Sequence, residues 1–212
     1  MKQPTGMVLI VDDDPSVRTG LQRLFNSVGL AARAFGSAEE FSSAVVQDVP
    51  ACLIVDVRLP GPSGLEFQDQ LLRAGIYIPI IFISGYGDVR TAVRAMKGGA
   101  IEFLDKPIHD QELLDAVYSA LQQDKARRED DEVLSQLKAK FNLLTKREHE
   151  VMALVVAGRL NKQIADDLKI SEITVKFHRG QVMKKMSAKS IAELVKMSER
   201  LLSSNSSFER SQ

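Results

Sequence analysis

The hydrophobic residues in the first part of the chain fall into five short apolar runs separated by amphipathic segments. The clearest runs are Met7–Val11, Cys52–Val55 and Ile78–Ile83, and weaker ones cover Ala31–Phe35 and Ile101–Leu104. Uninterrupted apolar runs of this length are typical of strands buried on both faces. The segments between the runs repeat apolar residues at helical spacing. The pattern therefore predicts strands that alternate with helices.

Local signals predict where these helices begin and end. Asp14 followed by Pro15 is a helix start, and Ser37 begins a capping box whose helix we expect to end near Val46. Further helices are predicted for 64–74 and 88–97, with a last one beginning near Asp110. Because parallel neighbours need crossover connections, five strands alternating with five helices predict an α/β fold with a doubly wound, five-stranded parallel sheet.

Polar side chains of types that take part in catalysis or metal binding follow four of the five predicted strands. Asp12 and Asp13 follow the first strand, Asp56 and Ser84 end the third and fourth, and Lys106 follows the fifth. The carboxyl ends of parallel strands meet at one edge of a sheet, so we expect these groups to come together there. Clustered carboxylates repel one another unless a cation joins them, and Mg²⁺ prefers oxygen ligands. The set therefore predicts a Mg²⁺ site in which an aspartate accepts a phosphoryl group beside a lysine.

These motifs resemble the receiver domain of two-component response regulators over about residues 7 to 122. The resemblance rests on Val11-Asp12-Asp13, Asp56 followed by Pro60-Gly61, Ile83-Ser84-Gly85 and the run 99–107. It implies a flavodoxin-like sheet of strand order 2-1-3-4-5 and a cis peptide before Pro107. It also implies roles for particular residues: phosphoacceptor Asp56; Mg²⁺ ligands Asp12, Asp13, Asp56 and the Arg58 backbone carbonyl; phosphoryl contact Lys106; switch pair Ser84 and Phe103; and positions that tune phosphoryl lifetime, Arg58 and Tyr86.

Composition and charge add a second domain to this description. The 212 residues include 26% charged side chains, no apolar run long enough to span a membrane and no signal-peptide pattern, so we expect a cytoplasmic protein without membrane contact. The single cysteine, Cys52, excludes an intramolecular disulfide and a cysteine-rich metal site. Residues 1–142 carry 15 basic and 20 acidic side chains, whereas residues 143–212 carry 13 and 8. The basic end indicates a segment that meets an anionic polymer.

The region between the acidic and basic parts is predicted to be helical. Residues 111–142 contain no glycine or proline, and their apolar positions are interrupted by a dense charged run at Arg127–Glu132. We therefore expect one long helix to continue out of the first domain through a linker at 123–142. The resulting organisation is a receiver domain at 1–122, the linker, a second domain at 143–203 and a disordered tail at 204–212.

The second domain is predicted to contain four helices. Thr145 begins a capping box, Gly158 ends the first helix, and Asn161 starts a short helix that ends at Leu168. Ser171 then caps a basic helix at 172–186, which is followed by an amphipathic helix at 190–202. Two helices joined by a three-residue turn, the second of them basic, predict a helix-turn-helix that binds DNA.

The residues of this domain resemble the LuxR-type DNA-binding domain over about 138–203. The resemblance rests on Leu144-Thr145, Asn161-Lys162 and Ile173-Thr174-Val175-Lys176. With the receiver in front, the chain resembles FixJ/NarL-type regulators, closest to the FixJ branch that includes styrene- and toluene-pathway regulators. It implies a sensor histidine kinase, double-stranded promoter DNA, a homodimer when phosphorylated, and RNA polymerase for an activator as partners. The implied DNA-contacting residues are Asn161, Lys162, Thr174, Lys176, Phe177, Arg179, Gly180 and Lys184.

Two other interpretations compete with a phosphorylation-controlled regulator. An orphan regulator would use the same fold without phosphorylation, but the complete acidic set argues against it. A phosphatase of the haloacid-dehalogenase type could use the Asp12–Asp14 pattern with Ser84 and Lys106. That family needs threonine or valine where this chain has Ser16, and it leaves Asp56 without a role. We therefore expect a regulator rather than an enzyme, with slow self-dephosphorylation as its one possible reaction beyond phosphoryl acceptance.

Overall fold

The computed structural model describes residues 6–44, 48–85 and 88–209, without the side chains of 204–209. The chain divides into two compact units, Met1–Arg128 and Glu129–Gln212. The boundary between the units falls inside one uninterrupted helix, α5, which runs from Asp110 to Asn142. The long helix expected from the absence of glycine and proline is therefore confirmed.

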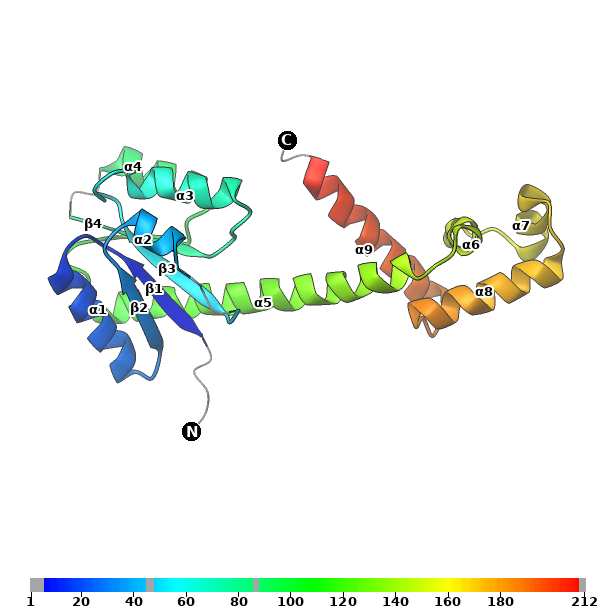
Figure 1. The fold of residues 1–212 in the computed structure, drawn as a ribbon, viewed down its shortest axis with the longest axis horizontal. Coiled ribbons are helices and arrows are strands. Elements are labelled where there is room, and N and C mark those ends of the chain that lie inside the picture. Colours follow the sequence, from blue (N-terminus) through cyan, green and yellow to red (C-terminus); the bar gives the residue numbers. More distant parts are fainter. Residues whose placement is uncertain (1–5, 45–47, 86–87, 210–212) are drawn as a thin grey trace. The chain divides into compact units, whose positions relative to one another are not determined.

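The first unit is built on a five-stranded parallel sheet of order β2-β1-β3-β4-β5 (Figure 1). Its strands are β1 Met7–Val11, β2 Ala31–Phe35, β3 Ala51–Asp56, β4 Ile80–Ser84 and β5 Glu102–Asp105. The connecting helices are α1 Pro15–Ser27, α2 Ala38–Ser42, α3 Gly64–Arg73 and α4 Val89–Lys97. The predicted fold class and strand order are both confirmed, because every strand pair is parallel and every connection crosses over.

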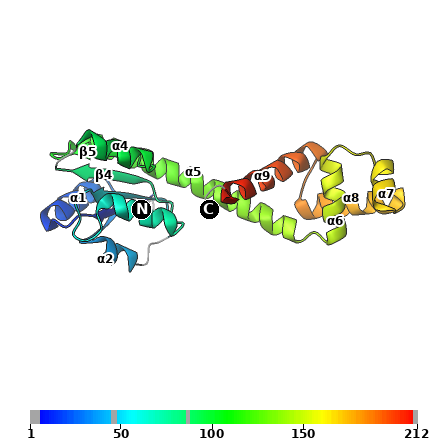
Figure 2. The same cartoon turned by 90° about the horizontal axis from the view of Figure 1, so that it is seen from above.

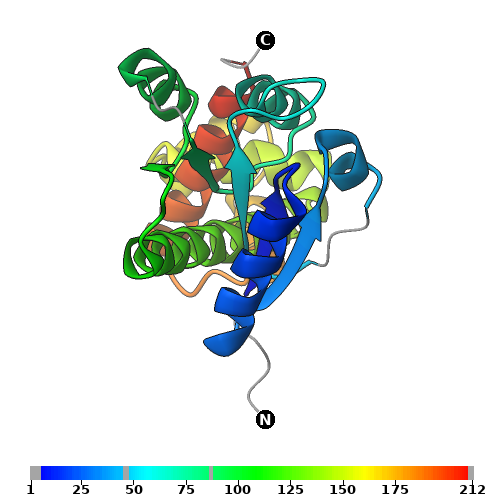
Figure 3. The same ribbon diagram turned by 90° about the vertical axis from the view of Figure 1, so that its left-hand side faces the viewer.

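Helices cover both faces of this sheet (Figure 3). Alternate residues of β1 point to opposite sides: Leu9 packs with Phe41 and Phe67 from α2 and α3, whereas Ile10 packs with Phe25 of α1 and with α5. Both faces are thus apolar, which explains why the central strands read as continuous hydrophobic runs instead of alternating ones.

Three element ends differ from the expectation by two residues or more. Helix α2 ends at Ser42, and Ser43 is its C-cap, so it is shorter than predicted; Val46, its expected end, lies outside the described residues. Strand β4 begins at Ile80 because Pro79 has no N–H to donate to the ladder. Helix α9, Ile191–Glu209, continues past Leu202 into the segment expected to be disordered. No glycine or proline follows Leu202 to end the helix.

The second unit is helical (Figure 2). Helices α6 Lys146–Val156, α7 Asn161–Leu168, α8 Glu172–Met186 and α9 surround one apolar core, to which the last turns of α5 contribute Leu137 and Phe141. Val175, Val182 and Met186 form the buried stripe of α8. Because this stripe faces the core, the basic face of α8 is left at the surface.

Candidate functional site

The three aspartates predicted to cluster do meet at the carboxyl ends of the strands. Asp12 follows β1 and Asp56 ends the adjacent strand β3. Both are buried, whereas Asp13 is exposed. One carboxylate oxygen from each lies within 4.8 Å of the others, so the group could hold a metal ion. Asp14 is not part of this group, because its side chain accepts a hydrogen bond from Ser16 N (2.7 Å) as the N-cap of α1.

Lys106, which follows the edge strand β5, completes the acidic cluster. Its Nζ lies 2.5 Å from Asp56 Oδ2 and 2.9 Å from Asp12 Oδ2. The Lys106 N–H donates to Ser84 O (2.7 Å), and the Lys106–Pro107 peptide is cis, as the resemblance implied. Partial burial would lower the pKa of Lys106, but its bonds to the two carboxylates outweigh this effect and raise the pKa. The amine is therefore charged and neutralises part of the acidic cluster.

Backbone contacts fix the Asp56 carboxylate and the loop that follows it. Asp56 Oδ1 accepts a hydrogen bond from Arg58 N (2.8 Å), and Gly64 N donates to Val57 O (3.0 Å). A Cβ at Gly64 would lie 2.4 Å from Asp56 O, so only glycine lets the first turn of α3 approach this closely. On the other side of the cluster, Arg18 Nη1 donates to Asp12 O at 2.6 Å. Burial raises the pKa of Asp12, although the bond from Lys106 opposes this effect.

The predicted switch residues lie on adjacent strands, Ser84 on β4 and Phe103 on the edge strand β5. Ser84 is 1% exposed at the end of β4, beside the acidic cluster. Phe103 pairs with Phe82 across β4 and β5, and their ring centroids are 6.5 Å apart. Phe103 is only partly buried. Arg58 is exposed, and Tyr86 lies outside the described residues.

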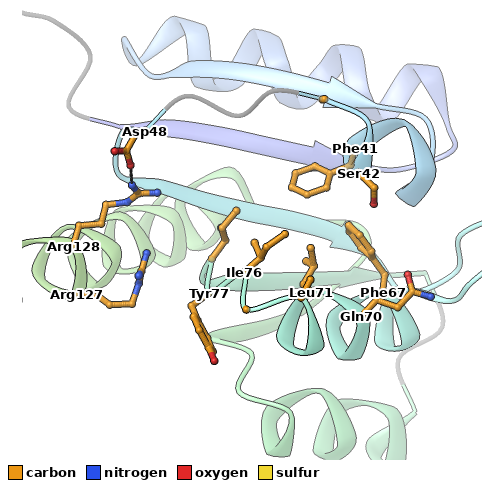
Figure 4. Close-up of a pocket in the computed structure, with 14 residues that line it drawn as sticks. Phe41, Ser42, Asp48, Phe67, Gln70, Leu71, Ile76, Tyr77, Arg127 and Arg128 are labelled. Atoms are coloured by element: carbon orange, nitrogen blue, oxygen red, sulfur yellow. Dashed lines mark hydrogen bonds and ion pairs between the residues drawn. The ribbon is translucent and has the colours of Figure 1, made fainter. Parts of the chain in front are cut away.

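A pocket of about 650 Å³ extends from between α2 and α3 to the segments that precede β3 and β4 (Figure 4). Apolar side chains including Phe67, Leu71 and Ile76 line it, and Arg127 and Arg128 form one end. Both guanidinium groups are occupied, because the buried carboxylate of Asp124 accepts hydrogen bonds from both, and Arg128 also pairs with Asp48. The lining residues that the structure describes include no member of the acidic cluster, and their two arginines carry no uncompensated charge.

The helix-turn-helix predicted in the second unit is present. Helix α7 ends at Leu168, and its C-cap Lys169 takes the left-handed conformation (φ 53°). Ser171 Oγ then accepts a hydrogen bond from Thr174 N (3.1 Å) and caps α8. Arg147 of α6 fixes the turn by donating to Leu168 O at 2.6 Å. Thr174, which was predicted to contact DNA, is thus also part of the N-terminal cap of α8.

Most predicted DNA-contacting side chains share one exposed surface. Lys162, Lys176, Phe177, Gly180 and Lys184 are exposed, whereas Asn161, Thr174 and Arg179 are half-buried. Arg179 Nη1 donates to Asn161 Oδ1 (2.6 Å), which joins α8 to α7 beside an open hollow of about 480 Å³. The hollow is lined by Leu160, Asn161, Lys162, Glu172, Lys176 and Arg179.

Two further residues of α8 differ from what the sequence indicated. Lys185, whose charge alone would assign it to the basic surface of α8, instead pairs with Glu148 of α6 at 2.7 Å and donates to Leu143 O. Sequence reasoning missed Ile173, which is 79% exposed on the same face as Phe177. An apolar residue four positions before Phe177 in a helix was the available signal.

Comparisons with known proteins agree with this architecture. Residues 8–118 match the response regulator receiver domain, and residues 142–198 match the bacterial regulatory proteins of the luxR family. Nodulation protein W of Bradyrhizobium diazoefficiens is 54% identical over 92% of this chain and 86% of its own. Response regulator protein TodT of Pseudomonas putida F1 is 45% identical over 95% and 88%. The solved structure of response regulator StyR has a TM-score of 0.84 at 45% identity, covering 92% of this chain and 99% of that one.

These findings argue against the phosphatase interpretation. The matched families are transcriptional regulators and not enzymes, and among the described residues the metal-capable group contains Asp56 and not Asp14. The described part of the chain also has no helix that is both long and apolar enough to cross a membrane. The chain therefore belongs to the two-component response regulators that join a receiver domain to a LuxR-type DNA-binding domain.

Proposed function

We propose that this regulator accepts a phosphoryl group on Asp56 from a sensor histidine kinase, and that the phosphorylated form dimerises and binds promoter DNA through α8. The observation that carries the proposal is the Lys106 amine held between Asp56 and Asp12, at 2.5 and 2.9 Å. A lysine in this place can neutralise an oxygen of the transferring group as readily as it neutralises the carboxylates.

The acidic group fits Mg²⁺. Three oxygens from Asp12, Asp13 and Asp56 lie within 4.8 Å of one another, and with the Arg58 backbone carbonyl they would hold the ion while leaving room for water or phosphate oxygens. When bound, Mg²⁺ supplies positive charge that stabilises the transferring phosphoryl group. Exposed Asp13 marks the side from which the ion and the phosphoryl donor enter.

The residues around Asp56 each have a role in the transfer. An oxygen of Asp56 attacks phosphorus as the P–N bond of the kinase phosphohistidine breaks, giving an aspartyl phosphate with about −1.5 to −2 charges. Lys106 contacts a phosphoryl oxygen, and the Ser84 hydroxyl donates to another. Movement of Ser84 leaves space into which Phe103 turns. The protein catalyses no further reaction except slow loss of its own phosphoryl group.

The dimer forms through α4 and the adjoining β5 and α5. Val89, Val93 and Met96 repeat at helical spacing on α4 and are 78%, 47% and 45% exposed. An apolar stripe at the surface of a receiver domain is an association face. Phosphorylation changes the population of the conformation in which this face pairs, so the unphosphorylated form retains some activity.

The exposed surface of α8, together with Lys162 of α7, reads DNA. Lys176, Lys184, Lys162 and Arg179 supply positive charge for phosphates or guanine edges, and Phe177 and Ile173 present apolar surface to thymine methyl groups. Gly180 leaves room for the helix to approach the groove. Two such domains in a dimer fit half-sites about one helical turn apart. The protein acts in the cytoplasm, and for an activator the DNA-bound dimer contacts RNA polymerase.

Acetyl phosphate, a small-molecule phosphoryl donor, tests the proposal without the kinase. Full-length protein with Mg²⁺ is treated with it, and phosphorylation, sedimentation and affinity for a duplex selected from a random-sequence library are measured, with Asp56→Asn as control. We expect the wild type alone to become labelled, to dimerise and to bind tighter. Label retained in Asp56→Asn would reject the acceptor, and a labelled wild type with unchanged sedimentation and affinity would reject the coupling to DNA.

A further inference from the structure

One buried amide fastens α4 to the receiver. Gln68 of α3 is 3% exposed, and its Nε2 donates to Gly98 O (3.0 Å) and lies 3.4 Å from Ala95 O, two carbonyls at the carboxyl end of α4. The last carbonyls of a helix have no partner within the helix, so a side chain that reaches them fixes that helix end in place. Neither the metal cluster nor the phosphoryl chemistry uses Gln68.

The glycine opposite Gln68 shows that this contact constrains the chain. Gly98 has φ −75° and ψ 0°, a conformation open to any residue, so its backbone does not require glycine. A Cβ at Gly98 would instead lie 2.6 Å from Gln68 Oε1 and 3.0 Å from its Cδ. The missing side chain of Gly98 thus makes room for the amide of Gln68.

Few other contacts hold α4. Among the residues of α4, all of which the structure describes, Ala95 alone is buried, and it lies next to the Gln68 amide. Val89, Val93 and Met96 point their apolar surface outward. A helix with so little buried surface would have a mobile carboxyl end without a polar anchor, and the stripe would then be poorly ordered before it met a partner.

We infer that Gln68 is a positioning residue that preorganises α4 for association of two receivers. The inference rests on the proposed function, because it takes the α4 stripe as the dimer face. Without the amide, dimerisation must also order the end of α4, and that cost weakens the dimer without changing phosphorylation of Asp56. Gln68 therefore acts on the output of the receiver and not on its chemistry.

Two variants remove the anchor from opposite sides. Gln68→Met keeps the length of the side chain and removes its donors, and Gly98→Ala pushes the amide away. Gln70→Met is the matched control, since Gln70 of the same helix lines the pocket on the α2 side. The amides of Gly98, Gly99 and Ala100, which bond to carbonyls of α4, report the anchor by hydrogen exchange.

We expect exchange of these three amides to be about fivefold faster in both variants, the equivalent of one lost hydrogen bond, and unchanged in Gln70→Met. Sedimentation after acetyl phosphate treatment should show a dimer Kd weaker by about the same factor, with labelling of Asp56 unchanged. Unchanged exchange would overturn the claim that Gln68 anchors the end of α4. Faster exchange with a wild-type dimer Kd would overturn the claim that this anchor preorganises α4 for dimerisation. A wild type that is labelled but stays monomeric would instead reject the proposed dimer, and with it the preorganisation.

Discussion

Replacing Gly180 by alanine should change stability and DNA binding in opposite directions. Gly180 lies in the interior of α8, and a Cβ built there meets no atom within 4 Å. Glycine inside a helix costs roughly 0.5–1 kcal/mol relative to alanine, and nothing in the protein would clash with the added methyl group. The free protein therefore gains no stability from having glycine at this position.

The expected gain in stability and the expected loss of DNA affinity both follow from this geometry. A gain of about 0.5–1 kcal/mol slows hydrogen exchange of α8 amides by about two- to fivefold where exchange follows opening of the helix. If Gly180 faces the groove, the methyl group overpacks that contact at about 1–3 kcal/mol, which is roughly 5- to 150-fold in Kd. The DNA assay is fluorescence anisotropy with a duplex selected from a random-sequence library.

Gly20→Ala provides the matched control. Gly20 is an exposed residue inside α1 that also has no atom within 4 Å of its virtual Cβ. It should slow exchange in α1 by a similar factor and leave DNA affinity unchanged. Faster exchange in Gly180→Ala would refute the open surroundings of the residue. Unchanged or tighter DNA binding would refute its place in the interface.

Three further predictions concern stability and site geometry. Gly64→Ala should cost about 1–3 kcal/mol and slow acetyl phosphate labelling, because the methyl group displaces Asp56 O; wild-type labelling would contradict this. Burial opposes ionisation of Asp124, but bonds from Arg128, Ala51 N and Arg127 lower its pKa, so its stabilisation is present above about pH 4 and lost below. Asp124→Asn should therefore destabilise by about 1–3 kcal/mol at pH 7, and chemical unfolding should show this difference shrinking on acidification, not persisting. Glu148→Gln should keep the capping box but lower the free energy of unfolding by up to about 1 kcal/mol, because the ion pair with Lys185 is lost. The double variant Thr145→Ala plus Glu148→Gln also removes the cap and should lose more. An equal loss in the single and double variants would contradict this prediction.

The sequence by itself determined the fold class and the membership of the acidic cluster. Apolar runs such as Cys52–Val55, alternating with helices, are buried best in a parallel sheet covered on both faces. Such a sheet brings the carboxyl ends of its strands together whatever the details of packing. Asp12, Asp56 and Lys106 are therefore close for reasons of topology. The helix-turn-helix could also be predicted from the sequence, because the helix caps at Thr145 and Ser171 depend only on residues next to them in the chain.

Only the tertiary structure decided which polar side chains face one another across helices. Lys185 looked like part of the basic surface, but its amine pairs with Glu148, 37 positions earlier in the chain. Gln68 and Gly98 carried no local signal at all, since neither a glutamine inside a helix nor a glycine at its end indicates a contact between α3 and α4. Such pairs depend on side-chain direction and on the distance between helices. Packing of the whole unit fixes both quantities, and local propensity does not.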